Sequence, residues 1–153
     1  MLWNAEAGTV LQRLCDHTAG IFGLDFSPDG TLLCSGSYDN RAVLWNWREP
    51  AQIGTFESGF THQVYAVTFS HTGQAIALCA LDQNHRSVIS LWHASTRHRC
   101  IAKVYGHRKQ VYSCEFHPLA PFMVTSSHDK TIKVWDLDEL YSKGFSEDEL
   151  AVV

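Results

Sequence analysis

The sequence lacks long apolar runs, a secretory leader and abundant charge. Its longest uninterrupted apolar run is 75–81, whereas a helix needs about 20 apolar residues to cross a bilayer. No basic-then-apolar segment opens the chain, so we expect a protein of the cytoplasm, the nucleus or both, without a membrane partner. Charged residues make up 18% of the 153 residues, against 45% hydrophobic ones. This balance predicts a packed chain with a sizeable core rather than a disordered one.

The motifs of common cofactor sites are also missing. Neither GxGxxG nor GxxxxGK occurs, which removes the obvious nucleotide-binding functions. The nine histidines are not paired at the close spacing of a zinc site, so we expect no metal and no cofactor. No CxxC pair occurs among the cysteines, which are odd in number and lie in apolar runs, and we therefore predict buried free thiols. They are Cys15, Cys34, Cys79, Cys100 and Cys114.

What the sequence does contain is a repeat. A histidine is followed at fixed intervals by a phenylalanine, an aspartate and a tryptophan, first at 17, 26, 39 and 45 and again at 107, 116, 129 and 135. The interval from His to Asp is 22 residues in both copies, and the interval from Asp to Trp is 6 in both. The tryptophans Trp3, Trp45, Trp92 and Trp135 follow one another after 42, 47 and 43 residues. Such a period is typical of four short strands per blade of a propeller.

On these residues the chain resembles the WD-repeat β-propeller family over about residues 1–137. Gly106-His107 and Trp135-Asp136 supply the paired GH and WD signatures in the last copy. The resemblance implies an all-β fold, a partial β-propeller of about three four-stranded antiparallel blades in an open arc. The repeat units run from about 4–45, 46–92 and 93–136, and the chain begins at the end of a preceding unit. Residues 138–153 form an acidic C-terminal tail, in which we expect a short helix over 138–141.

The repeat also predicts where the strands lie. We expect strands at 9–15, 21–26, 32–37, 42–45, 53–56, 64–69, 74–80, 88–92 and 99–105, with no clear fourth strand after Trp135. The middle unit departs from the pattern in two places. If Asp82 is its turn aspartate, the interval to Trp92 is 10 residues rather than 6, which predicts a protruding loop within 83–87. Leu78 also stands where the other units have Ser35 and Thr125.

Two sets of residues have the types of a nucleophilic triad. They are His17, Ser35 and Asp39, and His107, Thr125 and Asp129. A catalytic triad occurs once per active site, whereas this set recurs beside a tryptophan. The resemblance implies an internal hydrogen-bond network in each blade that includes Trp45 and Trp135 and ties the strands together. An enzyme is therefore the least favoured of three functional hypotheses, and we expect no catalytic residues.

The favoured hypothesis is a non-catalytic scaffold or adaptor for protein interactions, which needs only the repeats, and a basic surface is a candidate binding site for it. Antiparallel geometry brings His85 and Arg86, on the middle hairpin, to the same end of the blades as Arg108 and Lys109. Six Lys or Arg and no acid lie between Asp82 and Glu115. Such a patch suits an acidic or phosphorylated protein, and less readily a nucleic-acid backbone. The alternative is that these residues are only solvated loops.

The remaining hypothesis concerns the segment Trp45-Asn46-Trp47-Arg48. It is similar to the WDxR box of WD-repeat proteins that act as substrate receptors of cullin-RING ubiquitin ligases. The resemblance implies that Arg48 meets the ligase adaptor, with Asn46 in place of the usual aspartate. An Arg at this position also occurs in WD repeats without such a role, and the last unit, Trp135-Asp136-Leu137-Asp138, lacks it.

Overall fold

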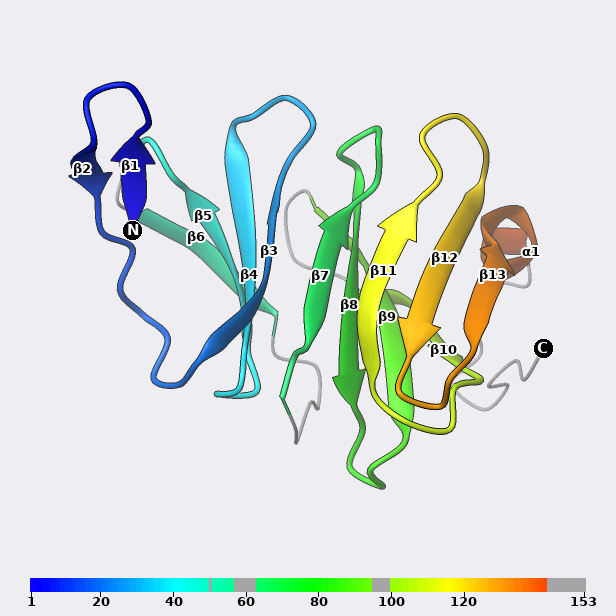
Figure 1. Cartoon of the computed structure of the whole chain (residues 1–153). Coiled ribbons are helices and arrows are strands. Elements are labelled where there is room, and N and C mark those ends of the chain that lie inside the picture. Colours follow the sequence, from blue (N-terminus) through cyan, green and yellow to red (C-terminus); the bar gives the residue numbers. More distant parts are fainter. Residues whose placement is uncertain (50, 57–62, 95–99, 143–153) are drawn as a thin grey trace.

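Successive antiparallel sheets follow the order of the chain (Figure 1). The computed structural model describes residues 1–49, 51–56, 63–94 and 100–142, with only the backbone of 51–52 and 141–142. The first sheet pairs β1 (Leu2–Asn4) with β2 (Thr9–Gln12). The elements of the next sheets are β3 (Ile21–Phe26), β4 (Leu32–Ser37), β5 (Ala42–Asn46), β6 (Ala51–Phe56), β7 (Ala66–Phe69), β8 (Ala75–Leu81), β9 (Ser87–His93), β10 (Cys100–Tyr105), β11 (Val111–Phe116), β12 (Phe122–Ser127) and β13 (Ile132–Asp136).

Each larger sheet is one blade in which neighbouring strands are also consecutive in the sequence. The first blade has the order β3-β4-β5-β6, and the second has β7 to β10 in sequence order. The third blade contains β11-β12-β13, and helix α1 (Leu137–Ser142) follows β13 directly. The blades stand in a row with β3, β7 and β11 in contact along one side, and they do not close into a ring (Figure 1). The predicted partial propeller in an open arc is thus confirmed, although three strands are described in its third blade.

The core lies between the blades, because the second blade buries both of its faces against its neighbours and each outer blade buries one. One apolar cluster joins the first two blades through residues such as Leu44, Phe56 and Val64, and a second joins the last two through Cys79 and Cys114. The first two blades approach closely at two glycines. A Cβ on Gly23 would lie 2.9 Å from the backbone nitrogen of Val67, and one on Gly36 would lie 2.7 Å from a methyl group of Val64. Any larger residue there would force the blades apart.

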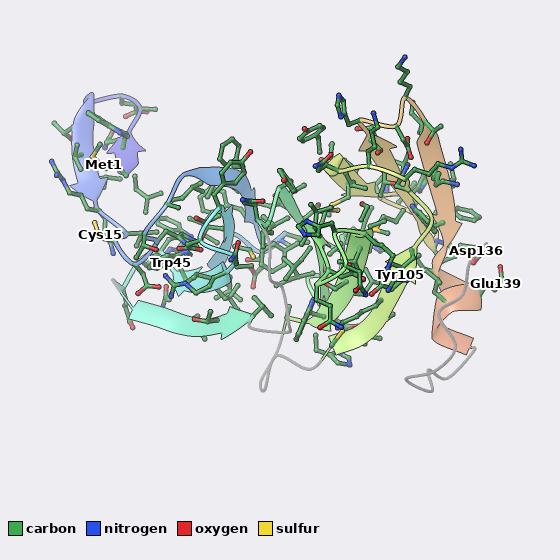
Figure 2. All side chains as sticks on the ribbon, turned by 90° about the horizontal axis from the view of Figure 1, so that it is seen from below. Met1, Cys15, Trp45, Tyr105, Asp136 and Glu139 are labelled. Carbon is green, nitrogen blue, oxygen red and sulfur yellow. The ribbon has the colours of Figure 1, made fainter. Side chains whose placement is uncertain are left out.

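The two outer faces of the arc are apolar and uncovered in the part of the chain that the structure describes. On the first blade Leu24 is 63% exposed, and on the third blade Ile132 and Val134 are 72% and 69% exposed. A hollow of ≈ 430 Å³ separates the β1–β2 sheet from the first blade, where Leu24 lines it. Figure 2 shows the arc from below, with Met1 and Cys15 at one end and Asp136 and Glu139 at the other. Apolar faces of this kind normally mark contact with another surface.

The hairpin of β8 and β9 is longer than its counterparts, but not as a loop. Both strands have seven residues, and their ladder runs from Ala75↔His93 to Leu81↔Ser87. The turn beyond it is closed by Asp82 N–H donating to the Arg86 carbonyl at 2.9 Å, just as Ser37 N–H donates to Arg41. The prediction of a protruding loop within 83–87 is therefore wrong. The additional residues extend the ladder, so the whole hairpin projects below its neighbours (Figure 1).

Most other local expectations hold. The predicted strands lie within about three residues of those observed, and the short helix after Trp135 is present. Residues 143–153 of the acidic tail lie outside the described residues. The cysteine prediction is right for Cys34, Cys79 and Cys114, which are buried. It is wrong for Cys15, which is exposed, and for Cys100, which is half-buried, because both lie on strands or linkers at the outer side of a sheet. The described part of the chain contains no helix long and apolar enough to cross a membrane.

Candidate functional site

The first blade brings its four predicted polar residues into one chain of hydrogen bonds. The imidazole of His17 lies 2.8 Å from Asp39 Oδ2 through Nδ1 and 2.7 Å from Ser35 Oγ through Nε2. The indole nitrogen of Trp45 donates to the same Ser35 Oγ at 2.8 Å. An indole N–H can only donate and an ionised carboxylate can only accept. With neutral His17, the Ser35 hydroxyl therefore donates a hydrogen bond to Nε2, and Nδ1–H donates one to Asp39.

The third blade repeats this arrangement from a different part of the sequence. His107 lies 2.9 Å from Asp129 Oδ2 and 2.8 Å from Thr125 Oγ1, which also accepts from the indole of Trp135 at 2.9 Å. The imidazole ring stands edge-on to the tryptophan with 6.2 Å between centroids, as in the first blade. Both chains connect the loop before a blade to its second and third strands. We call this set of contacts the blade network.

The aspartate of each network also holds its own turn. Asp39 Oδ1 accepts from Arg41 N–H at 3.1 Å, and Ser37 Oγ accepts from Asp39 N–H at 3.1 Å. Asn40 between them has a φ of 69°, in the left-handed region that asparagine tolerates. Burial alone would raise the pKa of Asp39, but hydrogen bonds from Thr18 N–H and His17 lower it to about 2. The pKa of Asp129 is lowered in the same way, against its burial, by Thr131 and Arg108 N–H.

The second blade lacks this set of residues within 63–94, the part of it described up to β9. Leu78, at the position of Ser35, is fully buried among apolar side chains. The indole of Trp92 donates instead to Ser90 Oγ at 2.8 Å, from a residue of its own strand. Sequence reasoning missed Ser90. The signal was present, because a buried indole N–H needs an acceptor and Leu78 cannot supply one. Asn84, followed by His85 with a φ of 58°, occupies the turn position that was assigned to Asp82.

The four candidate basic residues belong to two connections, His85 and Arg86 to the β8–β9 turn and Arg108 and Lys109 to the β10–β11 loop. Both connections lie at the lower end of the blades in Figure 1. Arg86 forms an ion pair with Asp82, in which Nε and Nη2 both donate to Oδ2, at 3.0 and 2.9 Å, and its guanidinium lies 4.7 Å from the ring centroid of Tyr105. Arg108 and Lys109 are exposed in the loop between β10 and β11. Asp82 thus offsets part of the expected charge, and Arg108 and Lys109 carry most of the remainder. His85 stands at the tip of the projecting hairpin.

Arg48 and Asn46 lie at the opposite end of the first blade. The side-chain oxygen of Asn46 accepts from Arg48 N–H at 3.2 Å, an Asx turn that an aspartate would form equally well. The guanidinium of Arg48 is exposed and lies 5.1 Å from the ring centroid of Trp47. Trp47 is anchored by its indole N–H, which donates to the Gly30 carbonyl at 2.8 Å. The exposed guanidinium of Arg48 therefore packs against an indole ring that is itself held in place by a hydrogen bond.

Two features together define the class of this protein. One is the blades of consecutive antiparallel strands, and the other is the blade network of His, Asp, Ser or Thr, and Trp that occurs in both the first and the third blade. They are the features of a propeller segment built from repeats. The family model of the WD domain, G-beta repeat, matches residues 8–46 and 98–136, just over half of the chain. The chain belongs to this family.

Individual relatives are more distant. Protein hir1 of Schizosaccharomyces pombe is 29% identical over 148 residues, covering 84% of this chain and 15% of that protein. Protein groucho of Drosophila melanogaster is 25% identical, covering 88% and 17%. A guanine nucleotide-binding protein subunit beta of Nicotiana tabacum is 29% identical, covering 79% and 33%. The chain thus spans a third or less of the length of these relatives.

Solved structures support the fold. The chain superposes on the structure of U3-55K with a TM-score of 0.74 at 23% sequence identity, covering 83% of this chain and 39% of that one. The WD40 repeats of RRP9 give the same TM-score and identity. At this level of identity, the likeness shows a common fold.

Proposed function

We propose that this chain is a non-catalytic scaffold or adaptor that binds other proteins through the rims of its blades. The observation that carries the proposal is the blade network. Its contacts have the distances of a catalytic triad, but Ser35 is 2% exposed and its Oγ is already engaged by His17 and Trp45. A hydroxyl that donates to His17 and accepts from Trp45 at the same time fits a structural role better than that of a nucleophile. The same arrangement at Thr125 supports a structural role, since a buried network ties strands together when all its members are paired.

The binding surface in this proposal is the lower rim, with Arg108 and Lys109 at its centre. Both residues are exposed, and they follow His107, whose ring is fixed within the blade. An acidic or phosphorylated protein is the partner that complements them. Arg86 and His85, on the projecting hairpin, lie at the same end of the blades, although Arg86 is held by Asp82. We expect such encounters in the cytoplasm or nucleus.

Affinity purification from cells tests the scaffold proposal. The bait is the 153-residue chain, with a variant carrying Arg108→Glu and Lys109→Glu as its comparison. We expect the wild type to retain specific proteins that the variant loses, and retention should fall as salt rises because exposed charges are screened. If no partner is recovered, or if all partners are indifferent to both changes, the lower rim is not the binding surface.

A second candidate function is that of a ubiquitin-ligase substrate receptor, and the geometry of Arg48 is what favours it. The arginine is exposed on Trp47, and Asn46 forms the turn that the usual aspartate would form. Arg48→Ala serves as the test in the same purification. Selective loss of ligase subunits, with other partners retained, supports the receptor. Unchanged recovery, or absence of ligase subunits from the wild type, leaves the scaffold alone.

A further inference from the structure

A continuous row of aromatic rings crosses all three blades at the lower rim. The members of this aromatic row are Phe22, Tyr38, Tyr65, Tyr112 and His128. The first two rings stack with 3.9 Å between centroids, and the following pairs meet edge-on at 5.6, 5.6 and 6.1 Å. Two of these contacts, Tyr38 with Tyr65 and Tyr65 with Tyr112, pass from one blade to the next. Residues far apart in the sequence therefore build a single surface.

Irregularities of the backbone direct these side chains outward. The pairing of β3 with β4 shifts register between Ile21 and Gly23, and that of β11 with β12 shifts between Val111 and Ser113. The residues at these shifts are Phe22 and Tyr112. A bulge of this kind adds one residue to a strand and re-aims its side chain, often beside a functional site. Tyr65 holds the equivalent position, immediately before β7.

The blade networks fix the two outer parts of the row. Tyr38 directly precedes Asp39, and its N–H donates to the Gly20 carbonyl at 2.9 Å. His128 directly precedes Asp129, and its N–H donates to the Gln110 carbonyl at 2.9 Å. The turns that carry these rings are therefore held by the buried aspartates. A rigid aromatic surface loses little conformational entropy on binding, which favours affinity.

The row is not needed to pack the blades. The contacts that join the sheets lie deeper, in the apolar clusters on both sides of the second blade. Phe22 remains 57% exposed and Tyr112 remains 53% exposed. Half-exposed, mutually supported aromatic side chains are the residues that most often dominate the energy of a protein interface.

Charge beside the row selects the partner. Arg108, Lys109 and Lys130 are exposed around its third-blade end, whereas the nearby carboxylate of Asp129 is turned inward to His107. We infer that the aromatic row docks an extended segment of another protein that places aromatic or proline side chains on the rings and carboxylates beside Arg108, Lys109 and Lys130. This inference rests on the proposed scaffold function and names the surface and the partner chemistry.

A single-stranded nucleic acid fits the row less well. Bases bind to aromatic side chains by stacking on parallel faces. Here the rings from Tyr38 onward meet at interplanar angles of 78°, 88° and 64°, so neighbouring rings do not offer parallel faces. The net charge of −4 also disfavours a polyanion as large as a nucleic acid.

A phage-displayed library of random short peptides, selected on the 153-residue chain, tests the inference. We expect the enriched peptides to combine aromatic or proline residues with Asp or Glu. Enriched peptides that are basic, or that lack aromatic and proline residues, would overturn the proposal. So would a single-stranded oligouridine probe that binds more tightly than the best peptide.

Fluorescence anisotropy with an enriched peptide then assigns the surface. Phe22→Ala with Tyr112→Ala should weaken binding by about tenfold or more, as loss of an interface aromatic does, and Lys109→Glu with Lys130→Glu should weaken it in a salt-dependent manner. Phe122→Ala is the matched control, since Phe122 is 39% exposed at the far end of the strand that leads to His128. Thermal melting checks that each variant is folded. Equal affinity of the aromatic variant and the control refutes the inference, whereas the scaffold proposal fails only if affinity purification recovers no partners.

Discussion

Removing Asp129 isolates the contribution of the blade network to stability. Its carboxylate accepts from His107 Nδ1 and Arg108 N–H through Oδ2, both at 2.9 Å, and from Thr131 N–H through Oδ1 at 3.0 Å. Asp129→Ala removes the acceptor of all three donors at once, and also that of the Thr131 hydroxyl, which donates to Oδ1 at 2.6 Å. The backbone donors lie near the surface, where water replaces the carboxylate at little cost. The His107 side chain is only 1% exposed, so its Nδ1–H loses its partner without gaining water.

An unpaired buried donor costs about 1–3 kcal/mol, and this is the expected loss in the free energy of unfolding for Asp129→Ala. The hydroxyl of Thr131 lies 3.3 Å from His107 Nδ1 and offers a weak substitute acceptor, which places the expected value in the lower half of the range. In the double variant with Thr131→Ala, the substitute is gone. The loss should then approach the upper limit.

Urea unfolding at one fixed protein concentration, followed by tryptophan fluorescence, measures the effect. Asn84→Ala is the matched control, because Asn84 holds the same turn position in the blade that has no network, and exposed substitutions usually change stability by less than about 0.5 kcal/mol. If Asp129→Ala and Asn84→Ala unfold at the same urea concentration, the network does not tie the blade together. The catalytic hypothesis for these residues would then be open again.

Three further predictions concern the core, the pH and the outer faces. The sequence alone suggests that Leu78→Ser destabilises less than Asp129→Ala. Because Leu78 is fully buried, the cavity and the buried hydroxyl should instead make Leu78→Ser costlier, with a loss of about 2–5 kcal/mol in the same urea assay. A smaller loss than for Asp129→Ala would contradict this. The folded-state pKa of Asp39 is about 2 and the unfolded value is near 4, so ionised Asp39 should contribute roughly 2–3 kcal/mol to the free energy of unfolding. This contribution should be complete above about pH 5 and be lost as the pH falls toward 2. Urea titrations of Asp39→Ala should show a shallower dependence of stability on acid pH. The exposed apolar faces of the first and third blades should make the purified chain associate, and light scattering that reports a monodisperse, cooperatively melting monomer would contradict that expectation.

The strands of the first and third blades were predictable because local and long-range signals agree in them. In the first blade, Ser27-Pro28-Asp29-Gly30 has the residues of a tight turn, and the chain indeed turns there with Gly30 at a φ of 67°. The run before this turn, Ile21–Phe26, contains β-branched and aromatic residues, and the His, Asp and Trp markers recur at constant intervals. A one-residue error in the register of such a strand would move its buried residues to the wrong face.

The second blade was misaligned because Asp82 has the residue type of the turn aspartate but not its position in the turn. Asp82 is an aspartate in a turn, but its side chain accepts from Arg86 and Asn84 N–H within that turn. Spacing counted from Asp82 to Trp92 assigned every extra residue to the loop. Only the strand pairing reveals that the ladder is longer on both sides, which moves the equivalent position to Asn84.

The aromatic row could not be predicted from sequence for a different reason. Phe22, Tyr65 and Tyr112 do recur at equivalent positions. In a regular strand, however, successive side chains point to opposite faces of the sheet, so a regular strand would not direct these rings to the rim. The register shifts that turn Phe22 and Tyr112 outward have no signature in residue type. Contacts between blades depend on how the sheets pack, which the order of residues along one blade does not specify.

The turns that the network holds separate the structural residues of this chain from its candidate binding residues. Asn40, His85 and Lys130 share a left-handed backbone, with φ values of 69°, 58° and 69°. For a lysine this conformation has an energetic cost that asparagine or glycine largely avoids. Two flanking hydrogen bonds stabilise it: Thr131 N–H donates to Asp129 Oδ1, and Asp129 N–H donates to Ser127 Oγ. The backbone is thus constant while its exposed side chains differ from blade to blade. The repeated network residues are buried inside the blade, so we expect discrimination between partners to come from exposed residues that differ from blade to blade, such as those of these turns on the lower rim.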